Sequence, residues 1–157
     1  MDKKGFTIIE LIVVIAVIAV LSAIVMINVV SYKDKSREAA IKAEMSQLSR
    51  FGVNYFYTKG NYEDFCDSLE AEPFFMKISD FAGSPIGCNN GAVHWKVCCV
   101  DRHGQTNDGL SWAVCAKLIT EPTSAWCSDY TGVSRKISLN NCENNMITNN
   151  LAVCPAS

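Results

Sequence analysis

The chain opens with a long hydrophobic run and then changes to shorter, patterned segments. From Leu11 to Val30, twenty consecutive residues carry no formal charge. A helix of that length extends about 30 Å, which matches the hydrocarbon thickness of a bilayer. The run therefore predicts a helix of membrane-spanning length over residues 6–30.

Beyond this run, apolar residues recur at the spacing of a helix face. They are separated by four, three, three and four residues: Ile41, Met45, Leu48, Phe51 and Tyr55. We expect one continuous helix over 6–57, about 78 Å long if straight. Its second half should pack this stripe against a sheet, while Glu38 and Lys42 form an i,i+4 pair in water.

The remaining residues, 58–157, predict a single globular head. Pro73 argues against long regular elements in a connecting region over 58–91, which has room for a short helix near 66–71. Short apolar runs between turns predict an antiparallel sheet over 92–139. Its expected strands are 92–100, 110–119, 125–130 and 133–139, and a C-terminal loop follows over 140–157. The fold class is α+β: a long N-terminal helix packed by its second half on an antiparallel sheet head stapled by disulfides.

Eight cysteines lie beyond the hydrophobic run: Cys66, Cys88, Cys98, Cys99, Cys115, Cys127, Cys142 and Cys154. An even number confined to this part of the chain predicts disulfides formed in an oxidising compartment. Adjacent residues of a strand point to opposite faces, so Cys98 and Cys99 should have different partners. Bonds from Cys98 to Cys115 and from Cys142 to Cys154 are two of the many pairings that remain open.

The segment Lys-Gly-Phe-Thr-Ile-Ile-Glu-Leu, which starts at Lys4, resembles the N-terminus of type IV prepilins and pseudopilins. The resemblance implies a leader over 1–5, whose lysines favour a cytoplasmic N-terminus. It also implies that a membrane-embedded prepilin peptidase cuts between Gly5 and Phe6, and that Phe6 becomes N-methylated. A secretory signal fits less well because the apolar core is too long and no Ala-x-Ala-like site follows. A plain signal anchor explains neither Gly5 nor Glu10.

Glu10 is the candidate assembly residue. A carboxylate at the edge of a membrane segment needs a partner. In pilins the equivalent glutamate is thought to meet the Phe6 amine of a neighbouring subunit, which implies the same pairing here. A local contact between Phe6 and Glu10 of one helix and a carboxylate reaching the headgroups remain alternatives.

The hydrophobic segment departs from the common family pattern at two positions. Many type IV pilins have a glycine near the position of Ala19 and a proline near that of Ile27, which break the helix. Both residues present here are compatible with an uninterrupted helix. The family's filament geometry therefore does not transfer directly to this chain.

The resemblance implies a structural subunit of a type IV pilus, used for adhesion, motility or DNA uptake. A pseudopilin of a type II secretion system is the alternative, and a membrane-anchored adhesin that does not polymerise is a third. The implied partners are identical or related pilin subunits, the prepilin peptidase and an inner-membrane assembly platform. The precursor is expected in the cytoplasmic membrane with its head outside, and the assembled form in an extracellular pilus or a periplasmic pseudopilus.

Charge and residue spacing argue against nucleic-acid binding, metal binding and enzyme activity. From Thr58 onward, seven basic residues face eleven acidic ones, which gives the head a net charge of −4. A broad nucleic-acid surface is therefore not expected, although Arg135 and Lys136 form a local basic patch. No cysteine pair has the C-x₂₋₄-C spacing of zinc sites, and residues 101–109 lack the ligand pattern of an EF-hand, so a weak calcium site there is the remaining metal alternative. We expect no enzyme activity, no cofactor and no metal.

Overall fold

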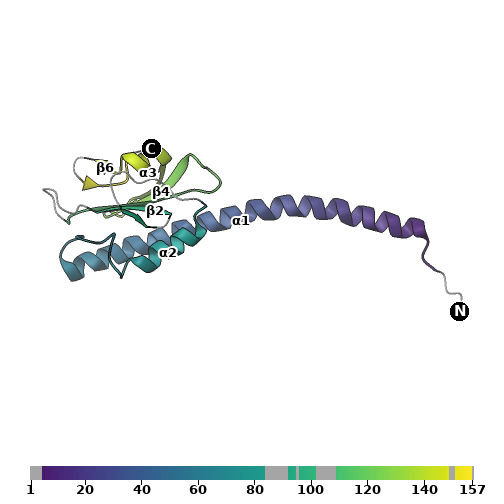
Figure 1. The fold of residues 1–157 in the computed structure, drawn as a ribbon, viewed down its shortest axis with the longest axis horizontal. Helices are drawn as coiled ribbons and strands as arrows, with labels where there is room; N and C mark the ends of the chain where they lie inside the picture. Colours follow the sequence, from purple (N-terminus) through teal and green to yellow (C-terminus); the bar gives the residue numbers. More distant parts are fainter. Residues whose placement is uncertain (1–4, 84–91, 95, 102–108, 149–150, 157) are drawn as a thin grey trace. The chain divides into compact units, whose positions relative to one another are not determined.

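The structure is a computed structural model that describes residues 5–83, 92–94, 96–101, 109–148 and 151–156. It divides into two compact units, Met1–Asp34 and Lys35–Ser157. Helix α1 (Ile8–Lys59) contributes to both units, as the ribbon in Figure 1 shows. The predicted long helix is confirmed, with each end displaced by two residues.

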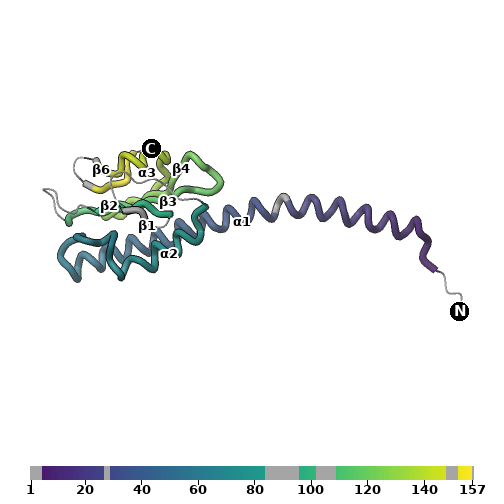
Figure 2. Tube along the Cα trace, in the orientation of Figure 1, coloured from purple at the N-terminus to yellow at the C-terminus, as the bar shows by residue number. Residues whose placement is uncertain are grey.

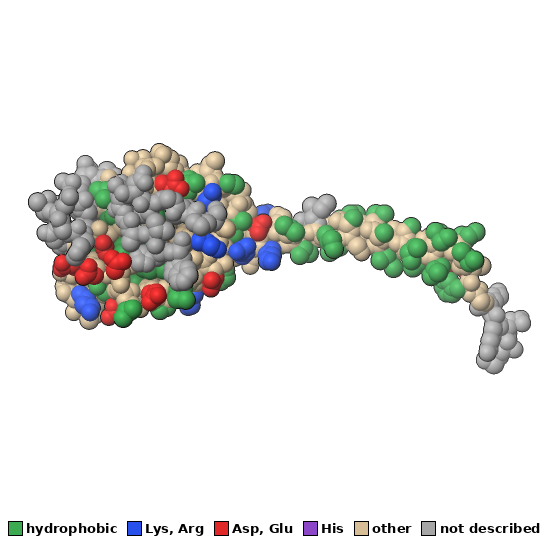
Figure 3. All heavy atoms as spheres, in the orientation of Figure 1, with side chains coloured by type: hydrophobic (Ala, Val, Ile, Leu, Met, Phe, Trp, Pro, Cys, Tyr) green, Lys and Arg blue, Asp and Glu red, His purple; other side chains and the backbone are tan. Residues whose placement is uncertain are grey.

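In the first unit, α1 is exposed along its apolar length wherever its side chains are described. Hydrophobic side chains lie over its visible face in Figure 3, and residues such as Ile8, Leu21 and Val30 are more than half exposed. By length and composition this helix can cross a membrane. It passes positions 19 and 27 without a break, as the absence of glycine and proline there predicts.

The second unit is built on a five-stranded antiparallel sheet with strands in sequence order. Its strands are β1 (Ala92–His94), β2 (Val97–Asp101), β3 (Trp112–Lys117), β4 (Ser124–Asp129) and β5 (Ser134–Ser138). All neighbours are antiparallel, and a hairpin around Thr131-Gly132 joins β4 to β5. The α+β fold predicted from the sequence is confirmed.

The expected single strand over 92–100 is wrong. The chain reverses within it, because His94 pairs with Val97 across the β1–β2 hairpin. The sequence between them contains none of the glycine, proline or asparagine residues that usually mark such a turn. The alternation of hydrophobic residues alone therefore predicts one strand where the structure has two.

The sheet has a hydrophobic core on each face. On one side the second half of α1 and helix α2 (Glu72–Phe81) cover residues that include Val97, Cys99, Trp112, Val114 and Ala116. On the other side the C-terminal segment covers Cys98, Ala113, Cys115, Cys127 and Ile137. The traces in Figures 1 and 2 show α2 and α3 on opposite sides of the sheet. The predicted packing of the aromatic stripe on the sheet is confirmed.

Helix α2 was not expected from the sequence. Pro73 falls in its first turn, where no intrahelical N–H bond is lost, so the residue starts this helix rather than preventing one. The helix packs on α1 through Phe74 and Phe51, whose ring centroids are 5.3 Å apart. The ammonium of Lys77 also lies 3.8 Å from the carboxylate of Glu44.

The C-terminal segment is more regular than the predicted loop. It forms helix α3 (Leu139–Asn144) and a small two-stranded sheet of β6 (Ile147–Thr148) and β7 (Leu151–Ala152). The Ser138 side chain caps α3 by accepting a hydrogen bond from the amide of Asn141. Because Met146, Ala152 and Cys154 are buried, this segment forms the second core rather than a solvated tail.

Three disulfides are described, joining Cys66 to Cys99, Cys115 to Cys142 and Cys127 to Cys154. The pairings expected from Cys98 to Cys115 and from Cys142 to Cys154 are therefore wrong. Cys98 does lie opposite Cys115 on the neighbouring strand. The β3 and β4 cysteines nevertheless bond outward to the C-terminal segment that covers their face. Cys98 is also disulfide-bonded, and Cys88 lies outside the described residues.

Candidate processing and assembly site

The bond between Gly5 and Phe6 lies in an exposed, non-helical stretch that precedes α1. Both residues are exposed, and Phe6 is 83% exposed. A Cβ added at Gly5 would meet no atom within 4 Å. Packing within the chain therefore does not require glycine at this position. The leader residues 1–4, with Lys3 and Lys4, lie outside the described residues.

Thr7 and Glu10 form a reciprocal cap at the start of α1. The Thr7 amide and hydroxyl both donate to Oε2 of Glu10, at 2.8 and 2.7 Å. In return, the Glu10 amide donates to the Thr7 hydroxyl at 3.3 Å. This Thr-x-x-Glu arrangement satisfies helix N–H groups that have no partner within the helix. Thr7 was not among the predicted site residues, although its spacing from Glu10 is the capping-box pattern.

The capping box defines the partners of Glu10 within its own chain. Its carboxylate turns back onto Thr7 and lies at the positive end of the helix dipole. In the uncleaved chain the nitrogen of Phe6 is a neutral amide. A charged amine exists at Phe6 only after the bond to Gly5 is cut. Glu10 is therefore held near the start of the helix by residues of its own chain.

Beyond the cap, α1 presents an apolar surface that no described residue of its own unit covers. The membrane-length window of the helix is 0% buried. An uninterrupted apolar surface of this length is stable only in lipid or against other apolar helices. The first unit thus combines an accessible bond, a capped glutamate and an uncovered hydrophobic helix.

In the second unit, acidic side chains tie distant segments together. Glu38 on α1 is 8% exposed and accepts hydrogen bonds from the amide and hydroxyl of Thr120, the latter at 2.7 Å. The expected Glu38–Lys42 pair in water is therefore wrong, because Glu38 faces the loop after β3. Asp101 similarly accepts from the amide of Cys66 at 2.8 Å.

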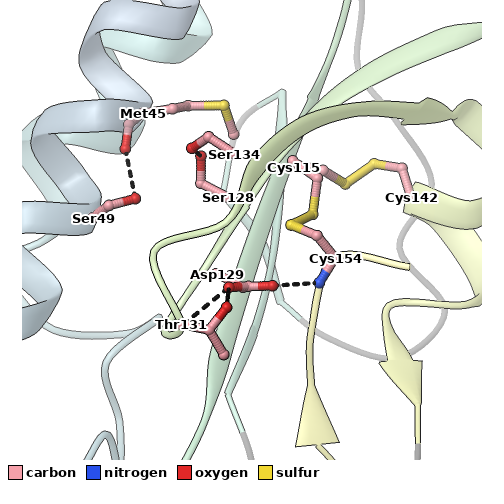
Figure 4. The surroundings of a disulfide bond; sticks show 10 residues. Met45, Ser49, Cys115, Ser128, Asp129, Thr131, Ser134, Cys142 and Cys154 are labelled. Carbon is pink, nitrogen blue, oxygen red and sulfur yellow. Dashed lines mark hydrogen bonds between the residues drawn. A yellow bond between two sulfur atoms is a disulfide. The ribbon is translucent and has the colours of Figure 1, made fainter. Parts of the chain in front are cut away.

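Asp129 fixes the C-terminal segment to the sheet, as Figure 4 shows. Its Oδ2 accepts from the Cys154 amide at 2.8 Å, and its Oδ1 accepts from the amide and hydroxyl of Thr131. The side chain is almost fully buried. These bonds hold the chain beside the Cys127–Cys154 disulfide, so this carboxylate stabilises the head.

Aromatic side chains fill the core between α1 and the sheet. The rings of Phe65 and Trp112 lie 4.8 Å apart, and those of Tyr55 and Phe65 lie 5.2 Å apart. Burial raises the pKa of Tyr55 above its ordinary value of 10.0, with Glu70 and other nearby carboxylates adding to the effect. Burial also raises the pKa of Tyr62.

Among the described residues, no group of three or more His, Cys, Asp and Glu side chains is arranged to hold a metal ion. Most of the weak calcium candidate, residues 102–108, lies outside the described residues together with His103. Arg135 and Lys136, the predicted basic patch, have different surroundings. Lys136 bonds to Glu121 at 2.8 Å, whereas Nε of Arg135 is buried.

Comparisons with known proteins agree with the N-terminal geometry. The family model described as the prokaryotic N-terminal methylation motif matches residues 1–26. The type IV major pilin protein PilA of Myxococcus xanthus (strain DK1622) is 31% identical over 70 residues, which are 45% of this chain. The match spans 32% of that relative's length. No solved structure matches the chain. In its N-terminal motif and the helix that follows, the chain is therefore similar to type IV pilins.

Proposed function

We propose that this protein is a structural subunit of a type IV pilus, processed at its N-terminus and polymerised through α1. The observation that carries the proposal is the uncovered apolar first part of α1, which starts directly after an exposed Gly5–Phe6 bond. Before assembly this surface is covered by lipid, with the N-terminus in the cytoplasm and the head outside. In the filament it is covered by the α1 helices of other subunits.

Processing makes the helix ready to assemble. A prepilin peptidase cuts the Gly5–Phe6 bond, and the Phe6 amine that is released becomes methylated. The amine retains its positive charge. In a medium of low dielectric constant it attracts the Glu10 carboxylate of an adjacent subunit, and each group reduces the cost of burying the other. An inner-membrane assembly platform adds the subunits.

The choice of a pilus subunit, with a pseudopilin of a type II secretion system as the alternative, draws its support from the comparison. The similar protein from Myxococcus xanthus is named a type IV major pilin. Adhesion, motility and DNA uptake all employ such a fibre, and the present proposal is limited to the structural role that they share.

The mature N-terminus tests the processing step. Fibres sheared from cells that express the full chain should contain a subunit beginning at Phe6 and carrying one methyl group, as intact-mass and N-terminal peptide analysis can show. Assembled subunits beginning at Met1 would contradict the proposal.

A Gly5→Leu variant separates recognition by the peptidase from folding. The position has open space around it, so the head should fold and form its disulfides normally. Uncleaved precursor should accumulate in the membrane. A Gly83→Ala variant is the control, because its added methyl group makes only an ordinary 3.6 Å contact with Ile119. Normal cleavage of the Gly5→Leu variant would show that the bond is not recognised through this glycine.

A further inference from the structure

A groove lies between the second half of α1 and the β4–β5 hairpin, wholly within the second unit. Its volume is about 400 Å³, inside the range of about 300–1,000 Å³ that is usual for small-molecule sites. The residues that line it come from both walls: Lys42, Ser46, Ser49, Arg50, Val53, Trp126, Gly132 and Ser134. The groove forms because β5 is the edge strand and its Ser134 faces α1 across a gap.

The charge of the groove differs from that of the head around it. Its lining contains Lys42 and Arg50 and no acidic residue, although acidic residues outnumber basic ones from Thr58 onward. The Lys42 ammonium lies 4.7 Å from the centroid of the Trp126 ring, which holds the cation against the groove wall. Arg50 is exposed and forms no ion pair within the described part of the chain. Two cations thus face one hollow without a carboxylate among its lining residues.

The remaining lining is suited to a hydroxylated ligand. A serine hydroxyl can donate one hydrogen bond and accept two, so three serines match the alternating donors and acceptors of a sugar. Ser49 donates to the Met45 carbonyl at 3.1 Å and keeps its lone pairs as acceptors. Ser134 is 2.5 Å from Ser128, and Figure 4 shows this pair on the sheet and Ser49 on the helix. Val53 and the accessible part of Trp126 supply apolar surface for sugar C–H groups.

The shape favours a small ligand over a folded partner. A stable protein interface needs roughly 800 Å² on each side, whereas this site is a hollow of about 400 Å³, a size that suits a small ligand. Arg50 presents a planar fork that can bind a carboxylate through two parallel hydrogen bonds, and Lys42 presents a compact charge. We propose that the groove between α1 and the β4–β5 hairpin binds an acidic oligosaccharide, with Arg50 and Lys42 on its carboxylates and the serines and Trp126 on its rings.

The test uses the full chain in detergent micelles, so its result does not depend on fibre formation. Trigalacturonate is titrated calorimetrically, with its methyl ester as the matched neutral ligand. The acid should bind and the ester should bind at least about tenfold more weakly, because esterification removes the charge and leaves the rings. Equal binding of both ligands, or binding of neither, would overturn the proposal.

Variants assign the contacts. Arg50→Gln and Lys42→Gln should each weaken trigalacturonate binding by about tenfold or more. Arg50→Lys should restore only part of the affinity, since it returns the charge without the planar fork. Lys59→Gln is the control, because this cation is on the same helix, outside the groove, beside Glu70. Unchanged binding by Arg50→Gln in a correctly folded head would refute the assignment.

An acidic polypeptide is the competing ligand. Triglutamate carries carboxylates without sugar hydroxyls, and it should bind more weakly than trigalacturonate if the serines and Trp126 contact the rings. Tighter binding of triglutamate would replace the saccharide with an acidic segment of protein, such as the exposed acids over 63–72 of another copy.

Discussion

Gly52 of α1 lies directly against the indole of Trp112 on β3. A Cβ at residue 52 would be 2.7 Å from Cζ2 of that ring, and Trp112 is almost fully buried. The glycine therefore allows the helix to approach the sheet at the centre of the aromatic core. The same glycine is unfavourable for the helix itself, by about 1 kcal/mol relative to alanine.

The Gly52→Ala substitution should destabilise the head despite its better helix propensity. The added methyl group requires the buried indole to move, which typically costs about 1–3 kcal/mol. Denaturant unfolding of the full chain in micelles measures this change, and Gly83→Ala provides the control at an open position. A Gly52→Ala protein more stable than wild type would show that propensity outweighs packing at this contact.

The disulfide pattern gives a second prediction. Peptide mapping of the native protein without reduction should recover Cys66 joined to Cys99, Cys115 to Cys142 and Cys127 to Cys154. Replacing both Cys115 and Cys142 with serine should lower the free energy of unfolding by about 2–4 kcal/mol, because the unfolded chain gains freedom. Peptides joining Cys98 to Cys115, or eight thiols alkylated without reduction, would contradict this connectivity.

Buried tyrosines make stability fall at high pH. The pKa of Tyr55 is raised in the folded head, so an unfolded chain releases this proton first as pH rises through about 10. The contribution of protonated Tyr55 to the stability of the folded head is complete below that pH. It is lost as the pH approaches the higher pKa that Tyr55 has in the folded head.

Unfolding measurements from pH 8 to above pH 10 test this effect, since the Tyr55→Phe variant should show a shallower decline than wild type. The variant also loses the hydrogen bond to the Glu63 carbonyl, so its stability at pH 8 should be lower. Tyr57→Phe, at an 84% exposed ring, is the control. An unchanged slope in the Tyr55→Phe protein would contradict the role of Tyr55.

Features with a strong periodic signal were predictable from the sequence. The helix pattern through Ile41, Met45 and Leu48 predicted the buried face of α1, and the short apolar runs between turns predicted the antiparallel sheet. These patterns work because local geometry and burial impose the same spacing. The α+β fold followed from them.

The remaining features depend on contacts between residues far apart in the chain. Glu38 faces Thr120, 82 residues away, and helical spacing gives no indication of that partner. Cysteine pairing similarly depended on the C-terminal segment folding back over the sheet. The groove combines Lys42 with Ser134 and could not be found from spacing alone. Pro73 and Thr7 are different, since a proline in a first turn and a Thr-x-x-Glu cap are local signals that the pattern of apolar residues does not contain.

The central claim is that Glu10 joins one subunit to the next, and Thr7 makes a direct test available. Glu10→Ala and Glu10→Gln should both reduce fibre number sharply, while membrane insertion, cleavage and disulfides remain intact, because each removes the charge that attracts a neighbouring Phe6 amine. Thr7→Val removes the hydroxyl of the cap but retains that charge, so its fibre number should remain close to wild type. Mixed expression of wild-type and Glu10→Ala subunits should show neighbour-dependent rescue.

The decisive measurement is a count of fibres by electron microscopy at matched levels of cleaved subunit. The account predicts few fibres for Glu10→Ala and Glu10→Gln and near-normal numbers for Thr7→Val. Normal fibre numbers for Glu10→Ala, or an equal loss for Thr7→Val, would contradict it, since Glu10 would then be dispensable or would act through the helix cap.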